Sequence, residues 1–207
     1  MHVVKGKKMR IRTAIVFVVL GTCLFISLFM SSASSRTLQE GSVRWGVPVD
    51  GLQMSISAVD SNNLDNPKFE VAIRNAGERD VTLNLGYMLG NGKVQLPQNI
   101  SLNVSDALGR TRKLEFFDRR YPAVAGRLDD YIVPLRAGSS YTLMLSLNQF
   151  WSPGTNEFGL KLFPGKNHIT AQFEGGGAKT SNLDVPGLKL MHFWLGNLQS
   201  NVLVIDR

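Results

Sequence analysis

The chain contains 207 residues, and its 23 Lys and Arg residues against 16 Asp and Glu residues give a net charge of +7. The first 35 residues hold five of the basic residues and no acidic one, so residues 36–207 carry 18 basic and 16 acidic residues, a net charge of only +2. This balance argues against nucleic-acid binding. The one cysteine, Cys23, lies in the N-terminal segment, so no disulfide stabilises the rest of the chain.

The N-terminus has the pattern of a segment that enters a membrane. Five Lys and Arg residues precede an uncharged, apolar run at residues 13–30, and small residues follow at 31–35. A cleaved signal peptide and an uncleaved anchor both have this order of residues. As a helix the run would span about 27 Å, close to the hydrocarbon thickness of about 30 Å, which favours the anchor. We therefore expect residues 36–207 to lie outside the cytoplasm, tethered by an N-terminal transmembrane helix, or secreted if residues 1–35 are cleaved.

Residues 36–44 are polar and lack periodicity, which predicts a linker before one domain at residues 45–207. In that domain apolar and polar residues alternate with a period of two, as in Leu52, Met54 and Ile56. The alternation predicts strands at residues 52–57, 69–74, 81–85, 100–104, 112–116, 131–135, 141–148, 160–163, 168–173, 193–195 and 202–205. Turn-forming Gly, Pro and Asn residues separate many of these strands. The sequence therefore predicts an all-β, antiparallel β-sandwich.

Two turns resemble those of a known type of domain. Residues 69–83 contain a strand, an Asn-x-Gly turn at 75–77 and a second strand, and residues 135–140 have the pattern L-x-x-G-x-S. Both resemble immunoglobulin-like (Ig-like) adhesion modules of bacterial exported proteins, and residues 194–202 are similar to the last strands of uncharacterised exported Ig-like domains. The resemblance implies an Ig-like β-sandwich that binds a partner. A proteinase-inhibitor family with a similar sandwich shares such turns.

The sequence contains no recognisable catalytic motif. No G-x-S-x-G or H-E-x-x-H pattern occurs, and His168 and His192 lack the spacing of metal ligands. Asp129 and Asp130 are adjacent, so on a strand they would face opposite sides. We therefore expect a binding module without catalytic residues, metal or cofactor. Two alternatives stay open: a proteinase-inhibitor-like module, and an enzyme whose carboxylate site would bring together Asp118, Asp129, Asp130 or His168.

Two further patterns concern the surface of the domain. Basic residues gather between positions 110 and 127, but acidic residues interrupt them, which predicts a solvated, charge-balanced surface rather than an anion site. Asn99 and Asn103 each begin an N-x-S pattern, the acceptor sequence for glycosylation in a eukaryotic secretory pathway.

The segment at residues 150–158 is the strongest candidate for a partner-binding loop. It places Phe150, Trp151 and Phe158 among Ser, Pro, Gly, Thr and Asn residues. Loops of β-sandwiches are frequent recognition sites, and aromatic rings supply large contact areas. We expect the partner to be another protein or a cell-surface component. The alternative is that Trp151 folds back and caps the end of the sandwich.

Overall fold

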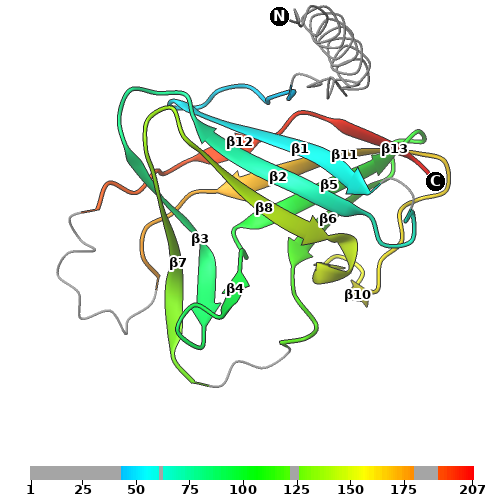
Figure 1. Cartoon of the computed structure of the whole chain (residues 1–207). Coiled ribbons are helices and arrows are strands. Elements are labelled where there is room, and N and C mark those ends of the chain that lie inside the picture. The colour runs from blue at the N-terminus through cyan, green and yellow to red at the C-terminus, as the bar shows by residue number, and fades with distance from the viewer. Residues whose placement is uncertain (1–42, 61–62, 122–125, 180–190) are drawn as a thin grey trace, which may run out of the picture. The chain divides into compact units, whose positions relative to one another are not determined.

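The computed structural model describes residues 43–60, 63–121, 126–179 and 191–207, which belong to one compact unit, Val43–Arg207 (Figure 1). The expected N-terminal helix and most of the expected linker lie outside the described residues. Within the described part, no helix is both long and apolar enough to cross a membrane. These residues are nearly all β, in antiparallel sheets, which confirms the predicted fold class at this level.

The described residues form thirteen strands and one short 3-10 helix. In chain order the strands are β1 Leu52–Asp60, β2 Lys68–Asn75, β3 Val81–Leu89, β4 Val94–Leu96, β5 Ile100–Asp106, β6 Thr111–Phe116, β7 Leu128–Leu135, β8 Ser140–Ser146, β9 Phe150–Ser152, β10 Glu157–Phe158, β11 Lys166–Glu174, β12 Asn197–Gln199 and β13 Leu203–Asp206. The helix η2, Leu147–Gln149, joins β8 to β9.

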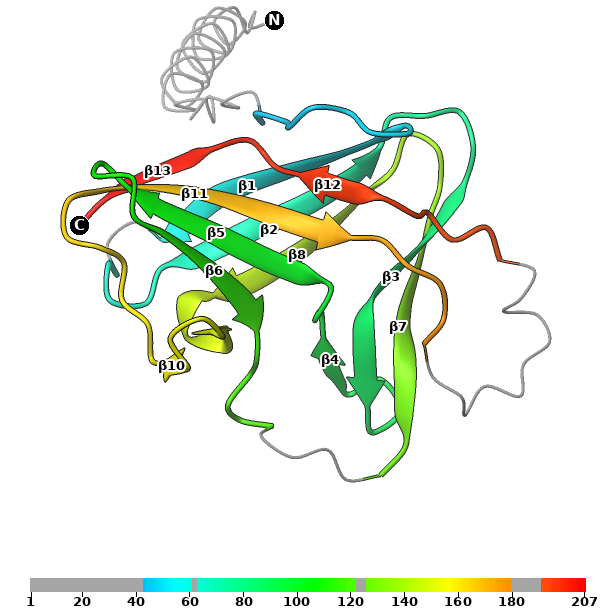
Figure 2. The same ribbon diagram turned by 180° about the vertical axis from the view of Figure 1, so that it is seen from behind.

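Three sheets organise these strands. The largest has the order β10-β9-β6-β5-β11-β12, and β13 also pairs with β11. A three-stranded sheet, β1-β2-β8, lies over one face of this seven-stranded sheet, and the core fills the space between them (Figure 2). The third sheet, β4-β3-β7, extends from this sandwich at an angle (Figure 1). Strand β3 follows β2 and β7 precedes β8, and both connections pass through one corner.

The core follows from the period-two alternation of the sequence. In β2, Phe69, Val71 and Ile73 are buried, as predicted, and their neighbours Leu143 and Leu145 across the β2–β8 pair are buried too. Every second residue of β5 and of β11 is likewise buried. Side chains from both layers join one hydrophobic cluster. The seven-stranded sheet therefore has one face toward the core and one toward solvent.

Asn75 joins the two turns that carry the Ig-like resemblance. Its buried side chain donates from Nδ2 to the carbonyl oxygen of Leu135 (3.2 Å), and its Oδ1 accepts from the amide of Gly77 (3.0 Å). Its backbone amide donates to the carbonyl of Ser139 (2.9 Å), and the amide of Gly138 donates to the carbonyl of Asn75 (2.8 Å). The two turns thus form one hydrogen-bonded corner where β2, β3, β7 and β8 meet.

Residues 160–163 do not form a strand, and residues 193–195 form only an isolated bridge from Phe193 to Thr82, so both parts of the prediction were wrong. Leu160, Leu162 and Phe163 are buried, and side chains, not a neighbouring strand, bond to backbone groups of Leu162 and Phe163. The Asn167 side chain bonds to both the amide (2.9 Å) and the carbonyl (2.7 Å) of Phe163, and Arg207 donates to the carbonyl of Leu162 (2.7 Å). Alternation of apolar and polar residues indicates burial of one face, and at residues 160–163 this burial occurs without a sheet.

Strand β8 is shorter than predicted. The apolar alternation continues to Leu147, but the chain turns into η2 after Ser146, whose amide donates to Gln149 Oε1 (2.8 Å). The strands β4, β9, β10 and β12 were not predicted, because two or three residues are too few to display a period.

Candidate binding site

The segment at residues 150–158 is a hairpin of β9 and β10 that divides its aromatic side chains between two faces. Phe150 lies opposite Phe116 of β6 and is 0% exposed, and the two rings meet edge to face with 5.6 Å between centroids. Trp151 lies opposite Glu115, and Phe158 opposite Trp151, on the outer face of the sheet. Successive side chains of a strand point to opposite faces. Of the three predicted contact residues, Phe150 therefore belongs to the core, while Trp151 and Phe158 are half-buried at the surface.

Three rings on this face form a cluster, which we call the aromatic cluster: Phe117, Trp151 and Phe158. The rings of Trp151 and Phe158 stack with centroids 5.4 Å apart and planes inclined by 15°. The ring of Phe117 lies 5.4 Å from that of Phe158 and 6.3 Å from that of Trp151. The guanidinium carbon of Arg119 lies 5.0 Å from the centre of the Phe158 ring, within cation–π range. The cluster therefore joins apolar rings to a cation.

Phe117 and Arg119 were not predicted as site residues. They follow β6 directly, and only the pairing of β6 with β9 brings them beside Trp151. The available signal was the pair of adjacent aromatic residues at 116–117, because two neighbouring side chains of an extended chain cannot both face one core.

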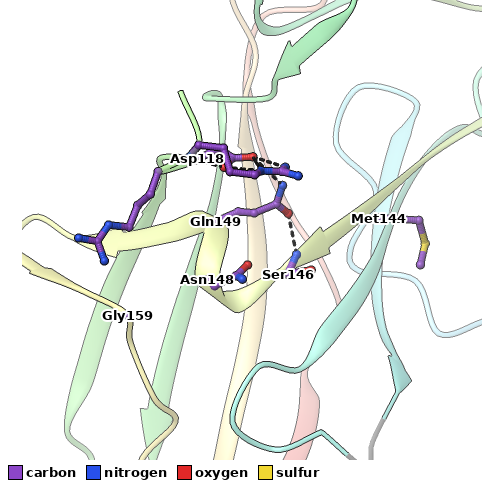
Figure 3. Close-up of a pocket in the computed structure, with 8 residues that line it drawn as sticks. Asp118, Met144, Ser146, Asn148, Gln149 and Gly159 are labelled. Carbon is purple, nitrogen blue, oxygen red and sulfur yellow. Dashed lines mark hydrogen bonds and ion pairs between the residues drawn. The ribbon is translucent and has the colours of Figure 1, made fainter. Parts of the chain in front are cut away.

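A cavity of about 490 Å³ opens beside the aromatic cluster. Figure 3 shows the residues that line it. The segment after β6, the end of β8, the helix η2 and Gly159 line it. Asp118 and Ser146 enter this cavity from different elements, and the side chain of Gln149 lies between them. Arg119 also lines the cavity, so the cavity and the cluster share a wall. A volume of this size is in the range of small-ligand sites.

The carboxylate of Asp118 is buried and engaged in structural hydrogen bonds. It accepts from the backbone amide (3.1 Å) and Nε (2.9 Å) of Arg120 and from Nε2 of Gln149 (3.2 Å). The side-chain hydrogen bond from Arg120 is the main cause that holds the pKa of Asp118 below its ordinary value, against the opposing effect of burial. Asp118 thereby fixes the segment that carries Phe117 and Arg119.

The four residues of the carboxylate alternative lie in three different parts of the fold. Asp118 follows β6, Asp129 and Asp130 lie on β7, and His168 lies on β11. Asp129 forms an ion pair with Arg127 (2.6 Å). Asp130 is buried and accepts hydrogen bonds. The cavity beside the aromatic cluster contains only Asp118 of these four. Among residues 43–60, 63–121, 126–179 and 191–207, no group of three His, Cys, Asp or Glu side chains could hold a metal ion.

Most basic residues between positions 110 and 127 have acidic neighbours, in agreement with a charge-balanced surface. Arg112 instead lies over the ring of Phe163, with its guanidinium carbon 4.2 Å from the ring centre. The ion pairs are Arg110–Asp106 (2.6 Å), Lys113–Glu115 (3.4 Å), Arg120–Asp118 and Arg127–Asp129 (2.6 Å).

Known proteins that resemble this chain do so only weakly and in structure. No family model and no curated protein matches the sequence. Among solved structures, a β-glucosidase from Erythrobacter marinus is similar with a TM-score of 0.34 and 15% identity, over 75% of this chain and 15% of that chain. The structural genomics target SoR45 has a TM-score of 0.33 and 10% identity, over 77% of this chain and 88% of that chain.

A β-glucosidase from Listeria innocua in complex with glucose has a TM-score of 0.31 and 13% identity, over 75% of this chain and 16% of that chain. This chain therefore spans about one sixth of the length of each β-glucosidase. Similarity at these TM-scores carries no argument about what this chain binds.

Proposed function

We propose that this protein is an exported, membrane-tethered recognition module with an Ig-like β-sandwich, and that it binds another protein or a cell-surface component without catalysis. The observation that carries the proposal is the stacked pair of half-buried rings, Trp151 and Phe158, on the outer face of the seven-stranded sheet. Aromatic rings bury a large area at a small entropic cost when a partner covers them, so they tend to dominate recognition.

The surroundings of the aromatic cluster also support binding. The cluster is fixed on one side by the paired strands β6 and β9 and on the other by the hydrogen bonds of Asp118. A surface that is already ordered loses little entropy on association. Arg119 and the adjacent cavity add polar groups at the rim, which suits a contact surface with an apolar centre.

The buried carboxylates favour binding over catalysis. In the described part, Asp106, Asp118 and Asp130 are the buried acidic residues, and each accepts hydrogen bonds from neighbouring groups. Burial raises the pKa of Asp106, but hydrogen bonds from Arg110 outweigh it and leave that pKa below its ordinary value. Carboxylates used in this way stabilise turns and strand ends.

Export and tethering rest on the N-terminal sequence. Basic residues before the apolar run at residues 13–30 support an orientation with the N-terminus in the cytoplasm. The Asn-x-Gly and L-x-x-G-x-S turns, which meet at Asn75, support the Ig-like assignment.

The function is tested by binding to the cell envelope. Purified full-length protein in detergent is mixed with envelope fragments from cells that lack it, and the fraction that sediments is measured. Trp151→Ala should lower the apparent affinity by about 30-fold, the equivalent of about 2 kcal/mol. The matched control is Trp45→Ala, which removes a half-buried indole that contacts Arg74 (4.4 Å), and it should bind normally. Equal binding by Trp151→Ala and the unchanged protein would contradict the proposal.

A further inference from the structure

A second hollow lies on the outer face of the seven-stranded sheet, which we call the amide groove. It measures about 510 Å³ and is formed over β5, β6, β11 and β12. Five of the residues that line it carry amide side chains: Gln98, Asn99, Gln172, Asn197 and Gln199. The side chain of Asn99 is already engaged, because its Nδ2 donates to the carbonyl of Asn84 (2.8 Å) and its Oδ1 accepts from Lys179 Nζ (3.0 Å). In the part of the chain that the structure describes, no hydrogen bond engages the other four amide side chains, so their donors and acceptors are free to meet a ligand.

The strand register connects the amide groove to the aromatic cluster. Directly opposed residues on neighbouring strands place their side chains on the same face, and the strands are about 4.8 Å apart. One such row crosses the whole sheet, over about 24 Å. Its members, in order, are Gln199, Gln172, Ser101, Glu115, Trp151 and Phe158. Trp151 thus stands beside Glu115 at the end of the groove, with Phe158 stacked on its ring.

The charge of the groove restricts its ligand. Lys113 and Glu115, both on β6, form an ion pair in its wall (3.4 Å), and Glu174 adds one negative charge. Lys179 adds a positive charge at the rim, because its Nζ bonds to Oδ1 of the lining residue Asn99 (3.0 Å). The two cations and two carboxylates balance, so the groove has no excess positive charge that would attract phosphates or acidic polymers. The remaining polar groups are neutral amides and the hydroxyl of Ser101, which can each donate and accept hydrogen bonds.

The backbone of the two central strands beneath the groove, β5 and β11, is engaged in strand pairing on both sides. Strand β5 pairs with β6 and β11, and β11 pairs on its other side with β12 and β13. An extended peptide recognised through added strand pairing needs a free sheet edge, which β5 and β11 do not provide. A ligand over these two strands therefore meets side chains.

We infer that the amide groove binds a neutral saccharide chain, whose hydroxyl groups bond to the amides while one sugar ring packs against Trp151. Hydroxyl groups match the paired donors and acceptors of Gln172 and Gln199, and the apolar face of a sugar ring matches an aromatic side chain. This inference rests on the proposed function, because it gives the chemistry of the cell-surface component that the aromatic cluster contacts.

The test is retention of the full-length protein by insoluble polysaccharides, in a zwitterionic detergent that carries no sugar headgroup. Cellulose, chitin, curdlan and starch granules serve as neutral probes, and alginate beads and casein beads serve as an acidic polysaccharide and a polypeptide. We expect at least one neutral polysaccharide to retain the protein. The double substitution Gln172→Ala with Gln199→Ala should weaken this retention by about tenfold or more.

The control is Thr142→Ala, which removes an exposed hydroxyl from β8 on the other sheet and should leave retention unchanged. A thermal melt checks that each variant is folded, and Asn197→Ala, at an exposed position, provides an independent groove variant. Retention by no neutral polysaccharide, retention by alginate or casein alone, or retention that the groove variants do not weaken would each overturn the inference. If envelope binding still requires Trp151 in that case, the proposed function stands without the saccharide. If envelope binding does not require Trp151 either, both the saccharide inference and the proposed function are wrong.

Discussion

The rings of Trp151 and Phe158 stack with 5.4 Å between centroids and 15° between planes on the outer face of the seven-stranded sheet. Phe150, one residue before Trp151 on the same strand, is fully buried on the inner face. Two adjacent residues therefore have different roles, one in the core and one at the surface. This separation allows stability and binding to be measured apart.

The alternation of β2 predicts opposite effects for neighbouring substitutions. Val71 is 0% exposed in the core, whereas Glu70 is half-buried on the opposite face. Val71→Asp should lower the free energy of unfolding by several kcal/mol, about 3 or more, because it removes apolar burial and buries an unpaired charge. Glu70→Lys should change it by less than about 0.5 kcal/mol. Urea denaturation measures both, and similar losses would refute the assigned strand faces.

The corner around Asn75 should be a major source of stability. Asn75→Ala removes three side-chain hydrogen bonds, those to the carbonyls of Arg79 (2.7 Å) and Leu135 and that from the amide of Gly77. We expect a loss of about 2–4 kcal/mol in the free energy of unfolding. Asn63→Ala is the control, because Asn63 accepts one hydrogen bond, from the amide of Asn66 (3.1 Å), in an exposed turn. A loss at Asn75 no larger than that at Asn63 would show that the corner does not hold the two turns together.

Stability should fall at alkaline pH because of Tyr131. Burial, and a hydrogen bond shared with Tyr141, raise the pKa of Tyr131 above its ordinary value. Above about pH 9 the unfolded chain begins to release this proton while the folded chain keeps it, so the free energy of unfolding decreases as pH rises. Urea midpoints between about pH 8 and pH 11 should show this decrease. Tyr131→Phe has no phenolic proton, so its decrease should be smaller, and an identical slope would exclude Tyr131 as the cause.

Much of the fold could be predicted from the sequence, because burial on one face of a strand produces a local pattern. Phe69 and Val71 follow that pattern, and Asn75 marks the turn after them. The site was only partly predictable. Phe117 joins Trp151 through the pairing of β6 with β9, and the amide row depends on the register of β5 against β11. Register between distant strands is determined by tertiary packing, which no local pattern contains.

The orientation of the chain in the membrane can be tested on intact cells. If basic residues hold the N-terminus in the cytoplasm, protease added outside should digest residues 36–207 and spare the N-terminal segment. Western blots with an N-terminal tag detect the protected fragment, and disruption of the cells should remove the protection. Full protection of residues 36–207 in intact cells would reverse the proposed orientation. N-terminal sequencing of the mature protein distinguishes the anchor from the cleaved leader, for which it should begin near Ser34.

The central claim is that Trp151 is a contact residue and not a cap on the core. The most direct test compares Trp151→Ala with Phe150→Ala in unfolding free energy, and Trp151→Ala with the unchanged protein in envelope binding. Phe150→Ala should cost about 3–5 kcal/mol, because it empties a buried site. Trp151→Ala should cost about 1 kcal/mol or less while it lowers envelope affinity by about 30-fold. A stability loss at Trp151 as large as that at Phe150, with envelope binding of the folded protein unchanged, would contradict the account.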